Sequence, residues 1–396
     1  MKIAIFTDSF PPLLDGVVTA TLNLAKGLAD KGHKVYIIAP KVKGLKKEFS
    51  YRNIKVKRLM SMPAMFYEGY RITSILNLSL LKFLKSEKIE LIHFQTPITV
   101  GIQGILISKI LKVPLVGTFH TFFTDKQYLK NARMDYKIVE KAGWRYARLL
   151  YDSCNLITAP SESTKRELLH HKFTSPIEVI SNGIDSRMFS NKEKEKVREK
   201  YLEQDKNLLL FVGRIAHGKN IPYLLDCFKL ILKKSPKTKL LIIGNGPQFE
   251  ELEKRVIKLK LEKKVILAGR IEHEKFVKSS ILGACDLFVT ASTTENQPMT
   301  MLEAQINALP CVGIAKRGVK DLIKNDYNGY LIKNNDKENF AKKVVCLLKN
   351  NSLKEKFREN TLEEVKKHEL KSVISRWEKV YSKLIKEKSK NSSFYS

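Results

Sequence analysis

Short runs of aliphatic and β-branched residues alternate with amphipathic helical patterns along most of this sequence. The first cycle contains an apolar strand at residues 2–6, a helix at 17–31 and a second strand at 34–39, which Pro40 ends. Strands that are buried on both faces read as continuous apolar runs, and a helix between two strands lets them pair in parallel. The alternation therefore predicts an α/β fold, with parallel sheets covered by helices on both faces.

The alternation occurs twice. In the first half the runs IELIHFQ, VPLVGTFH and CNLITAP follow, and the rhythm restarts at 207–212 with NLLLFV before KLLIIG, VILAG, LFVTAS and CVGI. The segment between the halves, SNGIDSRMFSNKEKEKVREKY, is charged and rich in turn residues, so we interpret it as a linker. We predict two facing, doubly wound Rossmann-like domains, with a cleft between them, at 1–189 and 190–371.

The C-terminal segment, residues 372–396, is predicted to be a helix and tail. Val373, Trp377, Tyr381 and Leu384 recur at helical spacing, which gives the helix one apolar face. We expect this helix to pack back on the N-terminal domain.

Cysteine usage and the N-terminus bear on location. The thiols have no paired spacing and occur mostly in apolar contexts, which favours reduced, buried cysteines: Cys154, Cys227, Cys285, Cys311 and Cys346. The start, MKIAIFTDSF, lacks a basic segment followed by a long apolar one, so we expect no signal peptide. The apolar stretch at 72–84 is shorter than the ~20 residues needed to span a bilayer. We predict a cytoplasmic protein that does not cross a membrane.

Charge is the unusual feature of the composition. There are 72 lysines and arginines against 41 aspartates and glutamates, a formal net charge of +31 at pH 7. Such an excess favours a polyanionic partner, either nucleic acid or an anionic membrane, and a lysine-rich genome is the alternative explanation. Because the sequence has no helix-turn-helix, zinc-finger or RNA-recognition signature, we expect no nucleic-acid partner.

Candidate ligand contacts are the polar residues that follow strands, because ligands bind at the carboxyl ends of strands in open parallel sheets. Gly16 precedes a predicted helix and permits close approach of a diphosphate. In FVGRIAHGKN, Arg214 and Lys219 follow a strand and can neutralise a diphosphate leaving group. Asn245 and Gly246, in the turn of IIGNGP, can contact a base or ribose. For each segment alone, turn chemistry or a solvated cation is the competing interpretation.

The segment TASTTENQPMTMLEA carries the sharpest signal. If a helix begins near Pro298, Glu295 lies in the preceding loop and Glu303 on the helix, so both carboxylates can face one cleft and accept hydrogen bonds from sugar and ribose hydroxyls. The intervening residues complete the candidate donor contacts: Asn296, Gln297, Met299 and Thr300.

Two histidines end consecutive strands of the first half. We interpret His120 as functional, close to a reacting carbon, and His93 as structural. No cluster of His, Cys and Asp has metal-ligand spacing, so we expect no metal.

Together these residues resemble the pattern of family 4 retaining glycosyltransferases, which have the GT-B fold: Gly16, His120, Arg214, Lys219, Glu295 and Glu303, with SNGID at 181–185 and NGYLI at 328–332. The resemblance implies that Gly16, Arg214 and Lys219 lie at the donor diphosphate, Glu303 at the ribose, Glu295 at the sugar hydroxyls and His120 beside the anomeric carbon. It implies no cofactor and no metal, with the nucleotide sugar as a substrate. Gly218, where the family usually has an acidic residue, and Pro298, where glycine is common, depart from the pattern.

Within the family, FTDSFPPLLDGVVTA and the ENQ sequence look most like bacterial diacylglycerol glycosyltransferases, the monoglycosyldiacylglycerol synthases. The resemblance implies transfer of glucose or galactose from UDP-glucose or UDP-galactose to diacylglycerol, at the inner face of the cell membrane. Another lipid or a saccharide, such as phosphatidylinositol or a lipopolysaccharide core, is the alternative acceptor. An anionic membrane surface would attract basic and aromatic residues, and we predict these contacts: Lys41, Lys43, Lys46, Lys47, Lys55, Lys57, Arg58, Phe66, Tyr67 and Trp144.

Overall fold

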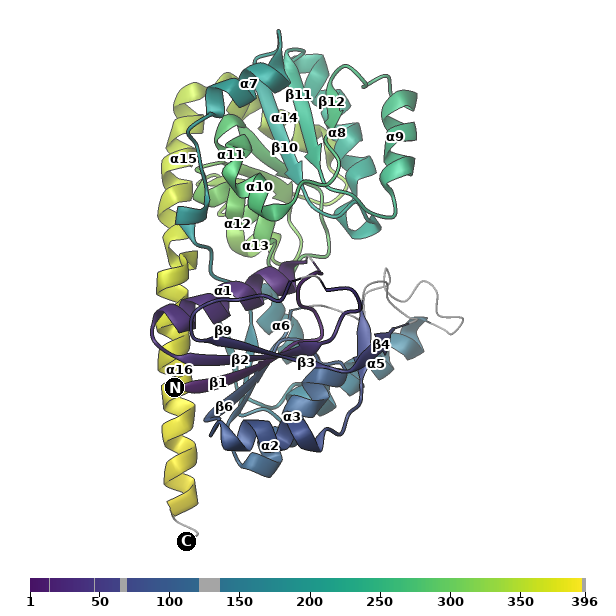
Figure 1. Cartoon of the computed structure of the whole chain (residues 1–396). Coiled ribbons are helices and arrows are strands. Elements are labelled where there is room, and N and C mark those ends of the chain that lie inside the picture. The colour runs from purple at the N-terminus through teal and green to yellow at the C-terminus, as the bar shows by residue number, and fades with distance from the viewer. Residues whose placement is uncertain (14, 46, 65–69, 121–135, 394–396) are drawn as a thin grey trace. The chain divides into compact units, whose positions relative to one another are not determined.

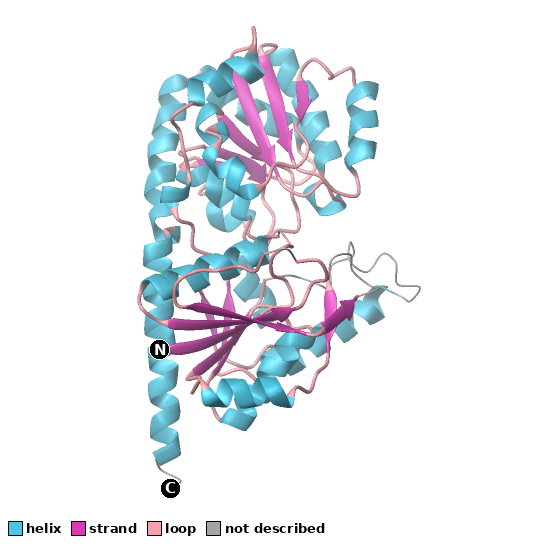
Figure 2. Cartoon of the chain, viewed as in Figure 1, coloured by secondary structure: helices cyan, strands magenta, loops and turns pink. Residues whose placement is uncertain are grey.

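The structure, a computed structural model, describes residues 1–13, 15–45, 47–64, 70–120 and 136–393. The chain forms two compact units. Unit 1 contains Met1–Gly183 together with Leu370–Ser396, and unit 2 contains Ile184–Glu369. The sequence analysis placed the boundaries at 189/190 and 371/372. Each unit has a parallel sheet with helices against its faces, which confirms the α/β class (Figures 1 and 2).

Unit 1 has a seven-stranded parallel sheet in the order β3-β2-β1-β6-β7-β8-β9, and a separate antiparallel hairpin, β4-β5. Its strands are β1 (Lys2–Phe6), β2 (Lys34–Pro40), β3 (Ile54–Leu59), β4 (Ser61–Pro63), β5 (Arg71–Thr73), β6 (Leu91–Phe94), β7 (Leu115–Thr118), β8 (Leu156–Ala159) and β9 (Ile177–Val179). Its helices are α1 (Gly16–Asp30), α2 (Leu78–Ser86), α3 (Thr99–Leu111), α5 (Tyr136–Tyr151), α6 (Glu162–His170) and α16 (Leu370–Ser393).

Unit 2 has a six-stranded parallel sheet in the order β12-β11-β10-β13-β14-β15. The strands are β10 (Asn207–Val212), β11 (Thr238–Ile243), β12 (Val265–Leu267), β13 (Leu287–Thr290), β14 (Cys311–Ile314) and β15 (Gly329–Ile332). The α-helices are α7 (Lys194–Leu202), α8 (Ile221–Lys234), α9 (Phe249–Lys258), α10 (His273–Lys278), α11 (Ile281–Ala284), α12 (Met299–Ile306), α13 (Val319–Leu322), α14 (Lys337–Lys349) and α15 (Asn351–Val365). Short 3₁₀ turns are η1 (Ser186–Met188), η2 (His217–Lys219) and η3 (Lys366–His368).

In both sheets the strand order reverses beside the first strand of the unit. In unit 1, β1 pairs with β2 on one side and with β6 on the other, and in unit 2, β10 pairs with β11 and β13. The helices that follow the two strands at a reversal cover opposite faces of the sheet, which leaves a crevice beside the loops at its carboxyl edge. Each unit therefore has one such edge where a ligand can bind.

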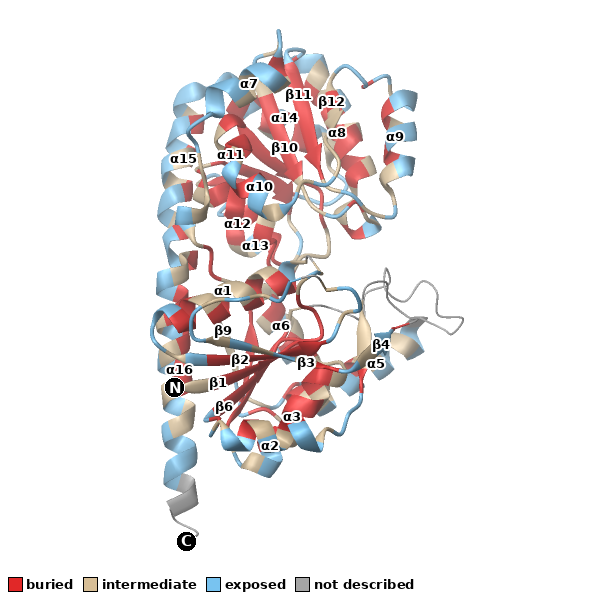
Figure 3. Ribbon diagram, viewed as in Figure 1, coloured by how far each residue is buried: buried red, intermediate tan, exposed pale blue. Residues whose placement is uncertain are grey.

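Side chains of each strand alternate between two cores, one on each face of the sheet. In β1, Ala4 and Phe6 belong to the core on one face and Ile3 and Ile5 to the core on the other. All four are fully buried, as the red strands of Figure 3 illustrate. This double burial explains why the strands read as unbroken apolar runs in the sequence.

Helix α16 packs against α1 and completes the core of unit 1, as predicted for the C-terminal helix. Val373, Ile374, Trp377 and Tyr381 form its buried stripe. The two helices approach closely at Gly27, where a Cβ atom would lie 2.4 Å from Cγ1 of Ile374. Any larger residue at position 27 would force the Ile374 side chain to move.

Two segments differ from their prediction. The expected linker contains η1 and most of α7, which packs against α11 and contributes the buried Leu202 to unit 2. The basic stretch at 54–59 forms β3, an edge strand in which Lys55 and Lys57 share the exposed face. Charged side chains on an edge strand discourage pairing with other chains, which is a structural use for these cations.

The cysteines are free, and four of them are buried. Burial raises the pKa of Cys227 to about 12. Cys346 is exposed on α14, contrary to the expectation that all five thiols are buried. In the part of the chain that the structure describes, no helix combines the length and apolar character needed to cross a membrane.

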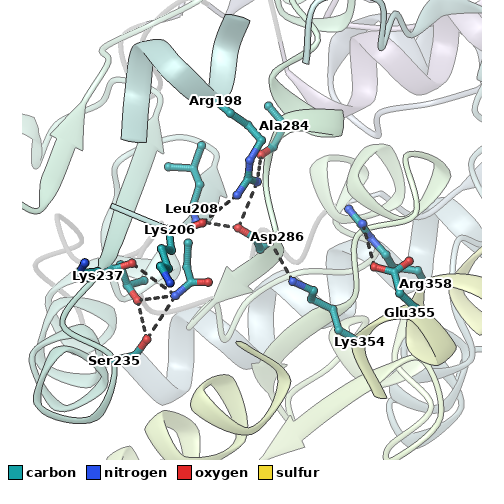
Figure 4. Close-up of polar contacts among 12 residues, drawn as sticks. Arg198, Lys206, Leu208, Ser235, Lys237, Ala284, Asp286, Lys354, Glu355 and Arg358 are labelled. Atoms are coloured by element: carbon teal, nitrogen blue, oxygen red, sulfur yellow. Dashed lines mark hydrogen bonds and ion pairs between the residues drawn. The ribbon is translucent and has the colours of Figure 1, made fainter. Parts of the chain in front are cut away.

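A buried charge cluster attaches α7 and α15 to the sheet of unit 2 (Figure 4). The Asp286 carboxylate, 7% exposed, accepts hydrogen bonds from the Leu208 N–H at 2.9 Å, from Arg198 Nη1 at 3.2 Å and from Lys354 Nζ at 3.1 Å. Lys354 is itself buried. Removal of one member of such a cluster leaves uncompensated charge in the interior.

We therefore expect Asp286→Ala to lower the free energy of unfolding of unit 2 by about 3–5 kcal/mol, measured by urea denaturation. The matched control is Glu355→Ala, which breaks the solvent-accessible pair with Arg358 drawn in the same figure. Glu355→Ala should lower the free energy of unfolding by less than about 1 kcal/mol. Equal losses for the two variants would show that the cluster does not stabilise unit 2.

Candidate active site

The loops after β10 and β13 lie side by side at the carboxyl edge of the unit 2 sheet. They are joined at Gly218, whose carbonyl oxygen accepts hydrogen bonds from the Ser292 hydroxyl at 3.1 Å and the Thr293 N–H at 3.0 Å. Gly218 departs from the family pattern in its side chain, but it is buried and its backbone fastens the cation-bearing loop to the carboxylate-bearing loop.

Lys219 and Glu295 meet at this junction. The Lys219 ammonium donates to Oε1 of Glu295 in an ion pair, and the Ser292 hydroxyl, which has one proton to share between the Gly218 carbonyl and this carboxylate, lies 3.1 Å from the same oxygen. Both charged side chains are largely buried. A bound diphosphate would compete for the ammonium, and the released carboxylate could then accept hydrogen bonds from hydroxyl groups. The structure thus brings together two residues that the sequence analysis selected separately.

Arg214 lies on the same loop as Lys219 and is exposed. The Ile215 N–H that follows it donates to the carbonyl oxygen of Asn245 at 2.9 Å, which joins this loop to the turn after β11. In that turn a Cβ atom on Gly246 would lie 2.4 Å from the Ile215 carbonyl oxygen. Close packing of two loops explains this glycine, while the exposed Asn245 side chain remains a candidate ligand contact.

Glu303 is on α12, as predicted, and its carboxylate is buried. The Nε2 atom of His273 lies 2.8 Å from its Oε1 atom. Sequence reasoning missed His273, although it opens α10 just after β12, and the rule applied to the other strands would have selected it. The pair places a partly exposed imidazole next to a carboxylate proposed to bind a ribose.

The residues between the two glutamates are more buried than expected. Asn296 and Gln297 are nearly inaccessible, and the Met299 side chain packs in the core of unit 2. Thr300 is partly exposed in the first turn of α12. The N-terminus of α12 directs backbone N–H groups and the positive end of the helix dipole away from the helix, which favours an anion there.

In unit 1, Gly16 is the first residue of α1 and is exposed. Asp15 caps the helix by accepting the Val18 N–H at 2.8 Å, and it also accepts the Ser9 hydroxyl at 2.5 Å. These hydrogen bonds join Ser9 and Asp15 to the start of the helix, where Gly16 is the first residue.

His120 follows β7 and lines a cavity of about 20 Å³, which is room for one water molecule. Gln95, Asn182, Gly183 and Trp377 also line it. Burial lowers the pKa of His120 to about 4, so its imidazole is neutral near pH 7. A neutral imidazole can both donate and accept hydrogen bonds at a polar substrate.

His93, interpreted from the sequence as structural, is fully buried, and both of its ring nitrogens have hydrogen-bond partners. Asp8, which sequence reasoning missed, is buried after β1. It accepts the Thr96 hydroxyl at 2.7 Å and the Val100 N–H at 2.8 Å, which caps α3. Burial raises the pKa of Asp8 to about 6.

Two predicted membrane contacts are wrong. Trp144, on α5, is 8% exposed, because its ring packs in the core of unit 1 and stacks on His171. The Arg58 guanidinium is held inside by the carbonyl oxygens of Pro11 and Pro40 and by Glu48.

The remaining basic candidates are exposed: Lys41, Lys43, Lys47, Lys55 and Lys57. Lys46, Phe66 and Tyr67 lie outside the described residues. Within the described ranges, no group of three or more His, Cys, Asp or Glu side chains could hold a metal ion.

Two family models match the chain, one in each half. The model for glycosyltransferase family 4 matches residues 14–187, and that for glycosyl transferases group 1 matches residues 193–364. The α-monoglucosyldiacylglycerol synthase of Streptococcus pneumoniae is 29% identical over 338 residues, which cover 84% of this chain and 75% of that protein. The enzyme of the same name from Acholeplasma laidlawii is 26% identical over 363 residues, 88% of this chain and 89% of that protein.

The fold matches that of Anabaena Alr3699/HepE, solved in complex with UDP-glucose. The TM-score is 0.76 at 18% identity, and the match covers 97% of this chain and all of that one. The two family models and this fold together identify a glycosyltransferase with the GT-B fold. More narrowly, the chain belongs to glycosyltransferase family 4.

We expect Lys219→Ala to weaken the binding of the preferred nucleoside diphosphate tenfold to about a hundredfold, because a charge-assisted hydrogen bond contributes about 1.5–3 kcal/mol. Calorimetric titration with UDP, GDP and ADP in parallel would identify that nucleotide and measure the loss. Lys196→Ala, an exposed lysine on α7, is the control and should bind as the wild type does. An unchanged affinity in Lys219→Ala, with an unchanged melting temperature, would remove Lys219 from the site.

Proposed function

We propose that this glycosyltransferase moves a hexose, glucose or galactose, from a UDP-sugar to the free hydroxyl of 1,2-diacylglycerol, with retention of the α configuration. The observation that carries the proposal is the Lys219–Glu295 pair at the β10–β13 reversal of the unit 2 sheet. It puts a cation for a diphosphate and a carboxylate for sugar hydroxyls at the edge where α/β sheets bind ligands.

The donor would be held by charges of both signs. Lys219 and Arg214 would bind the diphosphate oxygens, where negative charge increases as the glycosidic phosphate bond breaks. Glu303 would accept hydrogen bonds from the ribose, oriented by His273 at 2.8 Å. Glu295, freed from Lys219, would accept them from the hexose. Without donor, the charges of Lys219 and Glu295 thus neutralise each other. When the donor binds, Lys219 contacts the diphosphate and Glu295 contacts the hexose.

The reaction exchanges one bond for another. The bond between C1 of the hexose and the diphosphate oxygen breaks, the acceptor oxygen bonds to C1 on the same face, and the hydroxyl proton leaves with the diphosphate. His120, neutral because burial lowers its pKa to about 4, would bind the sugar near C1 without adding a positive charge beside an electron-poor carbon. Retention stays part of the proposal.

The names of the S. pneumoniae and A. laidlawii relatives support a diacylglycerol acceptor. An enzyme with such an acceptor has to work at a membrane surface. Exposed lysines at 41, 43 and 47 in unit 1 would be attracted to anionic lipid, by about 1 kcal/mol each when near the surface. We therefore place the protein at the membrane periphery, on the cytoplasmic face.

An apolar surface of unit 1 supports the same proposal. Strand β4, the residue before it, the turn into α2 and the first residue of α2 expose large apolar side chains that we call the hairpin patch: Met60, Met62, Ile75, Leu76 and Leu78. Met60 is 86% exposed, Met62 66% and Leu76 77%. Met60 and Met62 are two residues apart and so point to the same side, and β4 pairs with β5 just before Ile75.

Exposed apolar side chains beside cations are typical of proteins that enter the lipid interface. The outer face of α5 has the same character, since Ile138, Lys141, Arg145 and Leu149 are exposed at helical spacing.

Transfer should be tested with mixed micelles of diacylglycerol and anionic lipid, with UDP-glucose and UDP-galactose supplied separately. We expect one donor to give a monoglycosyl lipid whose anomeric proton is α, as determined by NMR. A panel with phosphatidylinositol and a lipopolysaccharide core would test the alternative acceptors. If the enzyme transfers hexose to another acceptor and not to diacylglycerol, the proposed acceptor is wrong, while the glycosyltransferase activity is confirmed.

Replacement of Met60, Met62 and Leu76 by serine should weaken binding to anionic liposomes at least tenfold, because burying three such side chains contributes more than about 1.4 kcal/mol. Cosedimentation measures the binding. Nucleotide affinity should not change, since the hairpin lies outside unit 2. Ile257→Ser with Leu362→Ser, which removes exposed apolar residues of unit 2, is the control. Equal liposome binding by both variants would exclude the hairpin patch.

A further inference from the structure

A buried network of polar side chains connects the C-terminal helix with His120. It begins at Tyr381 on α16, which is fully buried, and passes through His93 on β6. The Tyr381 hydroxyl lies 2.7 Å from His93 Nδ1, and the Thr118 hydroxyl lies 2.6 Å from His93 Nε2. Trp377 packs against the His93 ring, with the ring centroids 4.9 Å apart. Helix α16 therefore fixes both the position and the plane of this imidazole.

Gln95 forms the next connection. Its side-chain nitrogen lies over the face of the His93 ring, 3.0 Å from Nε2 and 3.2 Å from Nδ1. Its side-chain oxygen accepts from His120 Nε2 at 2.7 Å. The Gln95 amide therefore lies between the two imidazoles: it packs on the fixed His93 ring at one end and accepts from His120 at the other.

We propose that Tyr381 and Gln95 are positioning residues that hold the His120 imidazole in its Nε2–H tautomer and in one orientation toward the sugar. The inference rests on the proposed function, because it requires His120 to contact the hexose. Gln95 acts directly on His120, and Tyr381 acts through His93 and Gln95.

The composition of the network argues against a purely structural role. Tyr381, His93, Gln95 and Thr118 are at most 3% exposed, so each polar group has given up water. Apolar side chains of similar volume would fill the same space without that desolvation cost. A fully bonded polar network instead fixes one arrangement of its members. The network ends at His120, whose partly exposed imidazole lines a cavity. A fixed orientation matters at such a position because a ligand can reach the imidazole there.

Tyr381→Phe removes the first hydroxyl and keeps the ring. We expect kcat to fall about tenfold, while KM for the donor stays within about twofold. As a scale we use the lower end of the loss that follows when the residue orienting a histidine is removed, as known for histidines that bind metals. Tyr36→Phe is the matched control, since Tyr36 is also buried in unit 1 and its hydroxyl donates to Glu87 at 2.7 Å. This contact lies near the N-terminal end of β2, whereas His120 follows the C-terminal end of β7. It should leave kcat unchanged.

The tautomer provides a readout that a structural role would not change. In protein labelled with ¹⁵N-histidine, the ring nitrogen shifts of His120 should indicate Nε2–H in the wild type and in Tyr36→Phe. In Tyr381→Phe they should move toward a mixture of the two neutral forms. Unchanged shifts together with unchanged kcat in Tyr381→Phe would overturn the inference.

A double-mutant cycle separates this inference from the proposed function. If His120→Asn lowers kcat strongly and Tyr381→Phe lowers it no further in that background, Tyr381 acts through His120. If His120→Asn is fully active, the role proposed for His120 is wrong, whatever Tyr381 does. If His120→Asn is inactive but Tyr381→Phe retains wild-type kcat, the role of His120 stands and the positioning network is rejected.

Discussion

The reversal of strand order beside β1 and β10 is the constraint on which the rest of the structure depends. Because β10 pairs with both β11 and β13, the loops after β10 and β13 emerge side by side although about 75 residues separate Lys219 from Glu295 in the sequence. Opposite charges then meet without any local sequence signal for their contact. In unit 1, the pairing of β1 with β6 similarly brings Asp8 to Thr96 and to the start of α3.

Much of the fold could be predicted from the sequence, since strands buried on both faces appear as apolar runs whatever their neighbours are. Lys2–Phe6 and Asn207–Val212 have the predicted bounds, and α12 begins at Met299, just after Pro298. The edge strand β3 was missed because one of its faces is exposed and carries lysines, so that the residues alternate and resemble a basic surface segment.

The candidate site was predictable only in part. Lys219, Glu295 and Glu303 follow strands and carry charge, so position and chemistry together select them. Trp144 was placed at a membrane because an aromatic residue among cations has the same local pattern in a core helix and in an interfacial one, and only packing on His171 separates the two. The contact of Tyr381 with His93 joins residues 288 positions apart, and no local pattern encodes it.

The return of α16 to unit 1 has a consequence for synthesis of the chain. Unit 2 is an insertion within unit 1, because the chain leaves unit 1 after Gly183 and re-enters it at Leu370. A ribosome therefore releases the whole of unit 2 before it supplies the helix that covers Leu24, Ile5 and the other apolar residues of that face. Domains generally fold as they emerge, N-terminal part first. In this chain the first domain to be synthesised is the last to be completed, and until α16 is supplied the apolar face that it covers has no partner helix.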